Sequence, residues 1–104
     1  YNGKVFHRVA PNHVIQSGCP RGDGTGALDY SLRTEIGLTW YDRAGLLGMA
    51  SSGFDTEGTQ FFITQSARVH LDGNYTIFGL VKSGMDVVDK ILPGDVMEKV
   101  TVKY

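Results

Sequence analysis

Arg8 is the residue whose chemistry is hardest to explain by packing alone. It lies between Phe6, Val9, Val14 and Ile15, in a stretch that is otherwise typical of a hydrophobic core. A guanidinium is charged at every working pH and is almost never buried without a partner. An arginine on a strand is often a surface residue whose stem covers apolar neighbours. The alternative is a rigid set of N–H donors that acts on a ligand beside an apolar wall.

Some residues have the types used in hydrolytic catalysis, but their spacing does not support that function. Ser66, His70 and Asp72 lie close together in the sequence. Three residues on one short loop cannot easily take the geometry in which the histidine bridges the serine and the aspartate. The chain has no GxSxG nucleophile elbow, and its carboxylates sit among Gly, Ser and Thr, where Asp mainly makes turns. Hydrolysis therefore has no evident machinery.

Metal and phosphate sites are also not indicated. His7, His13 and His70 form no i, i+4 pair and have no cysteine partners at zinc spacing. The segment GDGTG at Gly22 to Gly26 resembles a phosphate-binding loop, but no strand leads into it and no Lys-Ser or Lys-Thr pair follows. We predict neither a metal nor a cofactor.

Composition limits the remaining classes of function. A chain of 104 residues with 41% hydrophobic and 20% charged residues predicts one globular domain. The net charge is −1 and the basic residues are scattered, which argues against nucleic acid as a partner. The apolar runs are too short for a membrane segment. Cys19 is the only cysteine, so an internal disulfide is excluded and a structural thiol is favoured over a reactive one.

Many turns are implied by 14 glycines, which separate short strand-like runs. These runs are Lys4–Val9, His13–Gln16, Leu46–Ala50, Phe61–Gln65, Thr76–Val81 and Val100–Tyr104, and they predict a barrel or a sandwich. One helix is predicted after Ser83, with a capping box from Ser83 and Asp86, an apolar face of Met85, Val88 and Leu92, and a stop at Pro93-Gly94. Pro20 to Leu38 is predicted to be a long loop.

A series of motifs carries more information than any single residue. The motifs are FHRV at Phe6, PNHVIQSG at Pro11, GLLGMA at Gly45, GTQFFIT at Gly58, LDGNYTIFGLV at Leu71 and GMDVVDKI at Gly84. In order, spacing and residue identity, this series resembles the cyclophilins, a family of peptidyl-prolyl isomerases, over essentially the whole chain. The resemblance implies a mainly β fold, a closed antiparallel β-barrel with flanking helices.

The resemblance also implies a site. Arg8 corresponds to the family's catalytic arginine, and Gln16 to the glutamine that steadies it. The positions that would bind substrate are Phe62, Leu71, Gln60, Val14, Met49 and Ala50, and those that depart from the best-known pattern are His13, Ser51, His70 and Tyr75. Of the adjacent Phe61 and Phe62, the resemblance places Phe62 in the proline pocket and Phe61 inside the barrel.

These departures lead to two hypotheses. His13 stands where a phenylalanine usually lines the pocket, and His70 where many members carry a tryptophan associated with cyclosporin binding, so weak or no cyclosporin binding is expected. His13 and His70 are equally compatible with rim positions. The first hypothesis is an isomerase that acts on Xaa-Pro bonds of proline-containing peptides or unfolded chains, with no cofactor. The second is a proline-peptide-binding module of a larger protein with little or no turnover.

The extent of the domain is a further expectation. Cyclophilin domains begin upstream of the FHRV motif with two strands and a helix, so residues 1–104 are expected to form a single domain that is incomplete at its N-terminus. Such a domain would have an open sheet edge, whose unpaired backbone N–H and C=O groups can pair with another chain. We hypothesise that the missing N-terminal segment is cleaved, left out or disordered, or that another chain supplies it.

Overall fold

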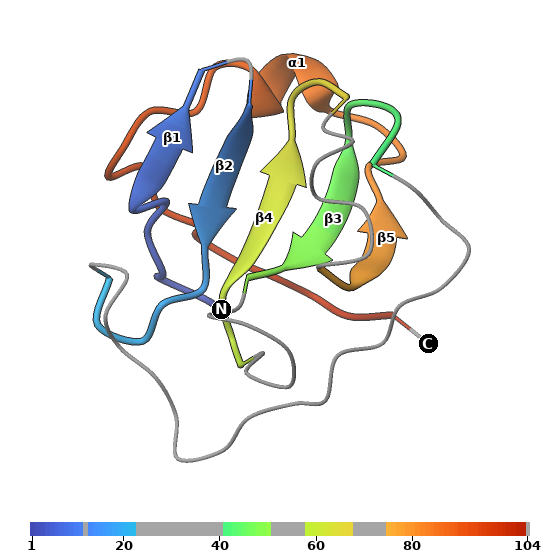
Figure 1. Cartoon of the computed structure of the whole chain (residues 1–104). Coiled ribbons are helices and arrows are strands. Elements are labelled where there is room, and N and C mark those ends of the chain that lie inside the picture. The colour runs from blue at the N-terminus through green and yellow to red at the C-terminus, as the bar shows by residue number, and fades with distance from the viewer. Residues whose placement is uncertain (12, 23–40, 51–57, 68–74, 104) are drawn as a thin grey trace.

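Five short strands form the centre of the computed structural model, which describes residues 1–11, 13–22, 41–50, 58–67 and 75–103. They are β1 Arg8–Ala10, β2 Val14–Ser17, β3 Leu46–Met49, β4 Phe61–Thr64 and β5 Ile77–Leu80. All neighbours are antiparallel, in the order β1-β2-β4-β3-β5 (Figure 1). The helix α1, Met85–Val88, follows β5. The predicted mainly β class is confirmed.

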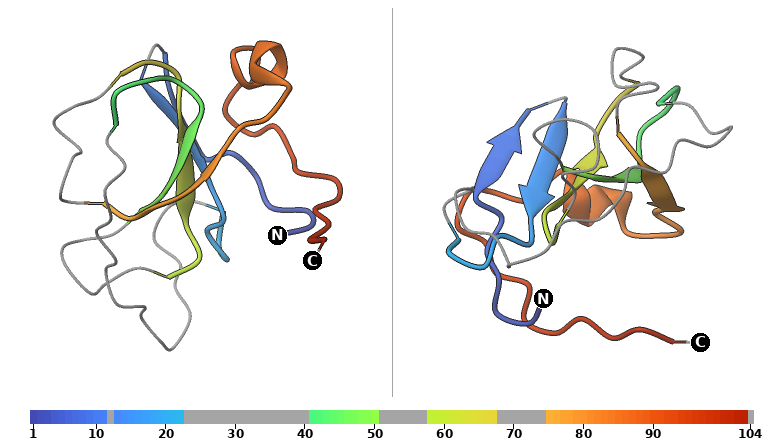
Figure 2. Two further views of the ribbon diagram at one scale, coloured as in Figure 1. Left: turned by 90° about the vertical axis from the view of Figure 1, so that its right-hand side faces the viewer. Right: turned by 60° about the horizontal axis from the view of Figure 1, so that its bottom comes forward.

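The sheet has two apolar faces, because side chains alternate along each strand. The first face, here called the Phe62 face, carries a buried cluster of Val14, Tyr41, Leu46 and Phe62. The second, the Ile15 face, carries a buried cluster of Phe6, Ile15 and Val88. The helix α1 and both chain termini lie on the side of the Ile15 face (Figure 2). This arrangement covers one face of the sheet with the chain's own terminal segments.

The N-terminal segment pairs with the C-terminal segment instead of extending the sheet. Backbone N–H groups of Gly3 and Phe6 donate to the carbonyls of Met97 and Asp95 over 2.7 and 2.9 Å. In return, the N–H of Met97 donates to Lys4 over 2.9 Å, and Val5 forms an isolated bridge with Val96. The predicted strand Lys4–Val9 is therefore divided, and only its last residues belong to β1.

The helix α1 differs from its prediction at both ends. Gly84 is the N-cap with a φ of 97°, and no side chain caps the helix, so the predicted capping box of Ser83 and Asp86 is wrong. Glycine adopts positive φ without a steric penalty, which lets the chain enter the helix without a capping side chain. The helix ends at Val88, and Leu92 is 65% exposed because the chain has already left helical geometry. Ile91 packs on the Ile15 face in its place.

The predicted strand Val100–Tyr104 needs correction. Residues 100–103 form no strand; the N–H of Val100 donates instead to Oδ1 of Asn2 over 2.6 Å, and Tyr104 lies outside the described residues. Within the described part of the chain the sheet is open, with β1 and β5 as its edges, which agrees with the open edge expected of an incomplete barrel. Most of the predicted loop Pro20–Leu38 lies outside the described residues. Cys19 is buried, and as the only cysteine of the chain it can form no internal disulfide.

Thr64 connects β4 to the turn that precedes β3. Its hydroxyl donates to the carbonyl of Arg43 over 3.1 Å and accepts from the N–H of Leu46 over 3.0 Å. Its carbonyl accepts from the N–H of Gly45 over 2.7 Å, and the side chain has no exposed surface. Because Leu46 belongs to the Phe62 cluster, Thr64 helps to fix that face of the sheet.

We expect Thr64→Val to lower the free energy of unfolding by about 1–3 kcal/mol, since it leaves a buried N–H and a carbonyl without their partner. Thr64→Ser keeps the hydroxyl and is the matched control, which is expected to lose less. Urea denaturation followed by circular dichroism measures both. A Val variant as stable as the Ser variant would show that these hydrogen bonds contribute nothing.

Candidate active site

A row of residues crosses the Phe62 face. The register pairs Arg8 of β1 with Gln16 of β2, and Gln16 with Phe62 of β4. Phe62 is in turn paired with Gly48 of β3. Residues directly opposite each other on paired strands project to the same face. The row therefore places a cation, an amide and an aromatic ring side by side, and continues to a residue that has no side chain.

The polar end of this row is linked by side-chain hydrogen bonds. Nη1 of Arg8 donates to Oε1 of Gln16 over 3.5 Å, and Nε2 of Gln16 donates to Oε1 of Gln60 over 2.9 Å. The first distance is long for a hydrogen bond and the second is ordinary. Arg8 is exposed, whereas Gln16 and Gln60 are half-buried. The guanidinium thus keeps contact with solvent, and its other N–H groups remain available to a ligand.

The apolar end of the row is built on Phe62, which is 5% exposed. Its ring lies 5.7 Å from the ring of Tyr41 at a tilt of 31°, and 5.8 Å from the ring of Tyr75 in an edge-to-face arrangement of 88°. Half-buried Ala50 and Ile77 pack against the same cluster. Aromatic pairs at such separations attract beyond their burial of area. The site therefore joins an aromatic wall to a solvated cation.

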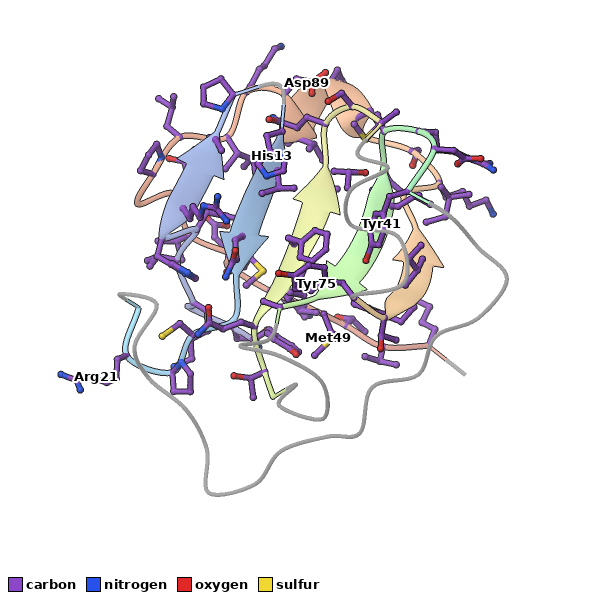
Figure 3. All side chains as sticks on the ribbon, in the orientation of Figure 1. His13, Arg21, Tyr41, Met49, Tyr75 and Asp89 are labelled. Atoms are coloured by element: carbon purple, nitrogen blue, oxygen red, sulfur yellow. The ribbon has the colours of Figure 1, made fainter. Side chains whose placement is uncertain are left out.

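The remaining predicted site residues are distributed around this row. Val14 belongs to the buried cluster, and the N–H of Ala50 donates to the carbonyl of Gln60 over 3.0 Å. Met49 is paired with Phe61, so alternation directs it to the face opposite Phe62. His13 precedes β2 in a turn, and Figure 3 shows it at the opposite end of the sheet from Met49. Ser51, His70 and Leu71 lie outside the described residues.

The sequence analysis missed Tyr41, which has no exposed surface and packs against Phe62. It precedes β3 without belonging to a periodic apolar run, so its burial has no local signal. Gly48 was an indirect signal, because a strand glycine often marks the close approach of other atoms. A Cβ atom on Gly48 would overlap both the Tyr41 hydroxyl and the Phe62 ring.

Arg8 is the positively charged residue of the site. Its partner is an amide, and within the described part of the chain it contacts no carboxylate. The exposed Asp42 pairs with Arg43 over 3.0 Å, and the hydrogen bond from Arg43 lowers the pKa of the Asp42 carboxyl. Among these residues no cluster of His, Cys, Asp and Glu could hold a metal, and no helix is long and apolar enough to cross a membrane.

Comparison with known proteins places this arrangement in context. The family model described as cyclophilin type peptidyl-prolyl cis-trans isomerase/CLD matches residues 1–103. Peptidyl-prolyl cis-trans isomerase B of Bacillus subtilis is 45% identical over 104 residues, which cover 99% of this chain and 73% of the relative. A peptidyl-prolyl cis-trans isomerase of Helicobacter pylori is 43% identical over 103 residues, which cover 96% of this chain and 63% of the relative.

The fold agrees with solved structures of the same class. A crystal structure of a cyclophilin type peptidyl-prolyl cis-trans isomerase of Cryptosporidium parvum has a TM-score of 0.82 at 37% identity, and the match covers 88% of this chain and 60% of that one. A second structure of that protein, in the presence of the dipeptide Ala-Pro, has a TM-score of 0.80. This chain thus spans less than two thirds of the Cryptosporidium and Helicobacter proteins. By sequence and by fold, the chain belongs to the family of cyclophilin-type peptidyl-prolyl cis-trans isomerases.

Proposed function

We propose that this chain catalyses the cis–trans isomerisation of Xaa-Pro peptide bonds in flexible or unfolded chains. The observation that carries the proposal is the cross-strand row in which Arg8 and Gln16 lie beside the aromatic wall of Phe62. We assign Arg8 as the catalytic donor and Gln16 as the residue that holds it. The assignment requires no metal and no cofactor.

The reaction needs only a well-placed hydrogen-bond donor. The barrier to rotation is roughly 18–20 kcal/mol, because the nitrogen lone pair is shared with the carbonyl. At the twisted transition state, this lone pair becomes localised on the prolyl nitrogen, which then accepts a hydrogen bond that the planar bond cannot accept. A donor at this position binds the transition state more tightly than the ground state, and catalysis depends on that difference.

An arginine is suited to this role. Its guanidinium does not lose its proton at any working pH, and it presents several N–H groups in a fixed plane. One of these groups is directed to Gln16, which orients the plane, and the long distance of 3.5 Å indicates that little of the donor strength is spent there. An uncatalysed step of tens of seconds would need about a 10⁴-fold acceleration, or roughly 5–6 kcal/mol, to occur in milliseconds.

The aromatic wall supplies the affinity for proline. Phe62, Tyr75 and Ala50 form an apolar surface next to the donor, as a pyrrolidine ring requires. We include Val14 and Gln60 in the binding site, and extend it to Ser51, His70 and Leu71 on the resemblance alone. Met49, which alternation directs to the opposite face, is not part of this surface. The related Cryptosporidium structure obtained in the presence of Ala-Pro supports a proline-containing ligand for this class of site.

The second candidate function, a proline-peptide-binding module with weak turnover, is favoured by the burial of Phe62 and by His13. Phe62 is only 5% exposed, so a bound proline ring can contact only a small part of it. On the resemblance, the half-buried His13 before β2 puts a polar ring where an apolar one would hold proline better. A loss of a few methylene groups of contact would weaken binding by about 1 kcal/mol or more.

Arg8→Ala is expected to lower kcat/KM for an Ala-Pro peptide by at least about 100-fold, the usual effect of removing a donor aimed at the transition state. Two-dimensional NMR exchange between the cis and trans peptide signals measures the rate. Arg21→Ala is the matched control, since it removes an equal charge from a side chain that extends away from the sheet (Figure 3). Equal rates in the wild type and the Arg8 variant would rule out the assigned role of Arg8, and peptide binding without exchange in the wild type would favour the binding module.

Gln16→Leu is expected to lower kcat by about 10-fold, because the leucine cannot accept from Arg8 or donate to Gln60. Its effect on the dissociation constant of the peptide should be smaller. The same exchange experiment, combined with an NMR titration, separates the two quantities. A variant with wild-type kcat would mean that Arg8 is positioned without Gln16.

Cyclosporin is expected to bind weakly, since His70 stands where many family members have the tryptophan associated with that ligand. Isothermal titration calorimetry measures the affinity, and the His70→Trp variant provides the comparison. We expect the variant to bind cyclosporin more tightly than the wild type. A nanomolar dissociation constant for the wild type would contradict this expectation.

A further inference from the structure

Tyr41 is the largest side chain that the described part of the chain buries completely. Its hydroxyl is within hydrogen-bond distance of two successive carbonyls, 3.3 Å from that of Tyr75 and 3.4 Å from that of Thr76. A hydroxyl has one proton to donate, so the two carbonyls share it, and both distances are longer than usual. Tyr41 thereby connects the segment that leads into β3 to the residues that lead into β5.

These carbonyls belong to the segment that carries one wall of the site. The Tyr75 ring lies edge-to-face on Phe62, and the carbonyl of Thr76 also accepts from the N–H of Met49 over 2.9 Å. The segment is thus attached to β3 by a backbone bond and to Tyr41 by the shared hydroxyl. Figure 3 shows Tyr41 and Tyr75 close to β3 and β4, near the middle of the sheet. Tyr41 therefore contacts Phe62 through its ring and the support of Tyr75 through its hydroxyl.

Gly48 makes this packing possible. A Cβ atom at Gly48 would overlap both the Tyr41 hydroxyl and the edge of the Phe62 ring. The space above the glycine is therefore filled by these two aromatic side chains together. Because protein interiors are close-packed, the Phe62 ring cannot move toward β3 unless Tyr41 moves as well.

We infer that Tyr41 is a positioning residue of the active site, which sets the separation between Phe62 and Tyr75 that a proline ring meets. Tyr41 is fully buried and does not contact solvent, so it acts through these two side chains and not on the substrate itself. This inference rests on the proposed function, because it assigns the same face of the sheet to proline binding. The inference adds that the relative position of Phe62 and Tyr75 depends on the hydroxyl of Tyr41, which lies beneath them.

The test compares the full chain with its Tyr41→Phe variant, which keeps the ring and loses only the hydroxyl. We expect KM for an Ala-Pro peptide to rise about 3- to 10-fold while kcat changes less than twofold, since binding in the ground and transition states weakens equally. Val88→Ala is the control: it truncates a buried side chain on the Ile15 face, and should lower thermal stability without a change in KM.

A second variant tests the same contact from the other side. Gly48→Ala introduces the Cβ atom that would displace Tyr41 and Phe62, so KM should again rise. In the double variant with Tyr41→Phe, the two effects should combine less than additively, because both disturb one contact. Full additivity would show that the two residues act independently and would count against the inference.

The outcomes separate this inference from the proposed function. A Tyr41→Phe variant with wild-type KM and kcat would overturn the role of Tyr41 and leave the isomerase assignment intact. If the wild type bound the peptide but catalysed no exchange, the isomerase assignment would be wrong. The peptide's dissociation constant would then be measured for each variant instead of KM. A weaker affinity in Tyr41→Phe would then support the inference, and an equal affinity would overturn it. A wild type that bound no proline peptide would overturn both.

Discussion

The register between β2 and β4 is the constraint on which the site depends. It places Gln16 opposite Phe62 and Ile15 opposite Ile63. Because side chains alternate with a period of two, a slip of β4 by one residue would exchange its two faces relative to β2. The slip would bring Ile63 next to the amide of Gln16 and send Phe62 toward α1. Buried clusters on both faces oppose this slip, so the same packing that stabilises the sheet also aligns Arg8, Gln16 and Phe62.

One face of the sheet stabilises the fold, and the other carries the candidate site. The Ile15 face is covered by α1 and by the paired terminal segments, and in the described residues it carries packing contacts. The Phe62 face combines an aromatic wall with an exposed guanidinium. A charged group beside such a wall must either stay in contact with solvent or be paired. Exposure of Arg8 thus resolves the apparent conflict between its charge and its apolar sequence neighbours, and it leaves the donors accessible to a peptide.

Short strand-like runs bounded by turn residues predict where β2 and β4 lie. The alternation of side chains along a strand then places Phe61 and Phe62 on opposite faces. The order of the strands could not be predicted in this way, because neighbours such as β2 and β4 are joined by contacts distant in sequence. The burial of Tyr41 was not predicted, because a single aromatic residue before a strand belongs to no periodic apolar pattern. The helix prediction failed at Ser83 because Gly84 adopts the N-cap conformation itself. Residues 100–103 have strand-like composition, but composition produces a strand only where a neighbouring edge pairs with it.

The measurement that tests this account most directly is an NMR titration of the full chain with an Ala-Pro peptide, in which side-chain signals on the two faces are compared. The account predicts shifts for the side-chain amides of Gln16 and Gln60 and the methyl groups of Val14 and Leu46, which lie on or beside the Phe62 face. The methyl groups of Ile15, Ile63 and Val88, on the opposite face, should not respond. Shifts concentrated on the Ile15 face would contradict the account, because they would place peptide binding away from Arg8.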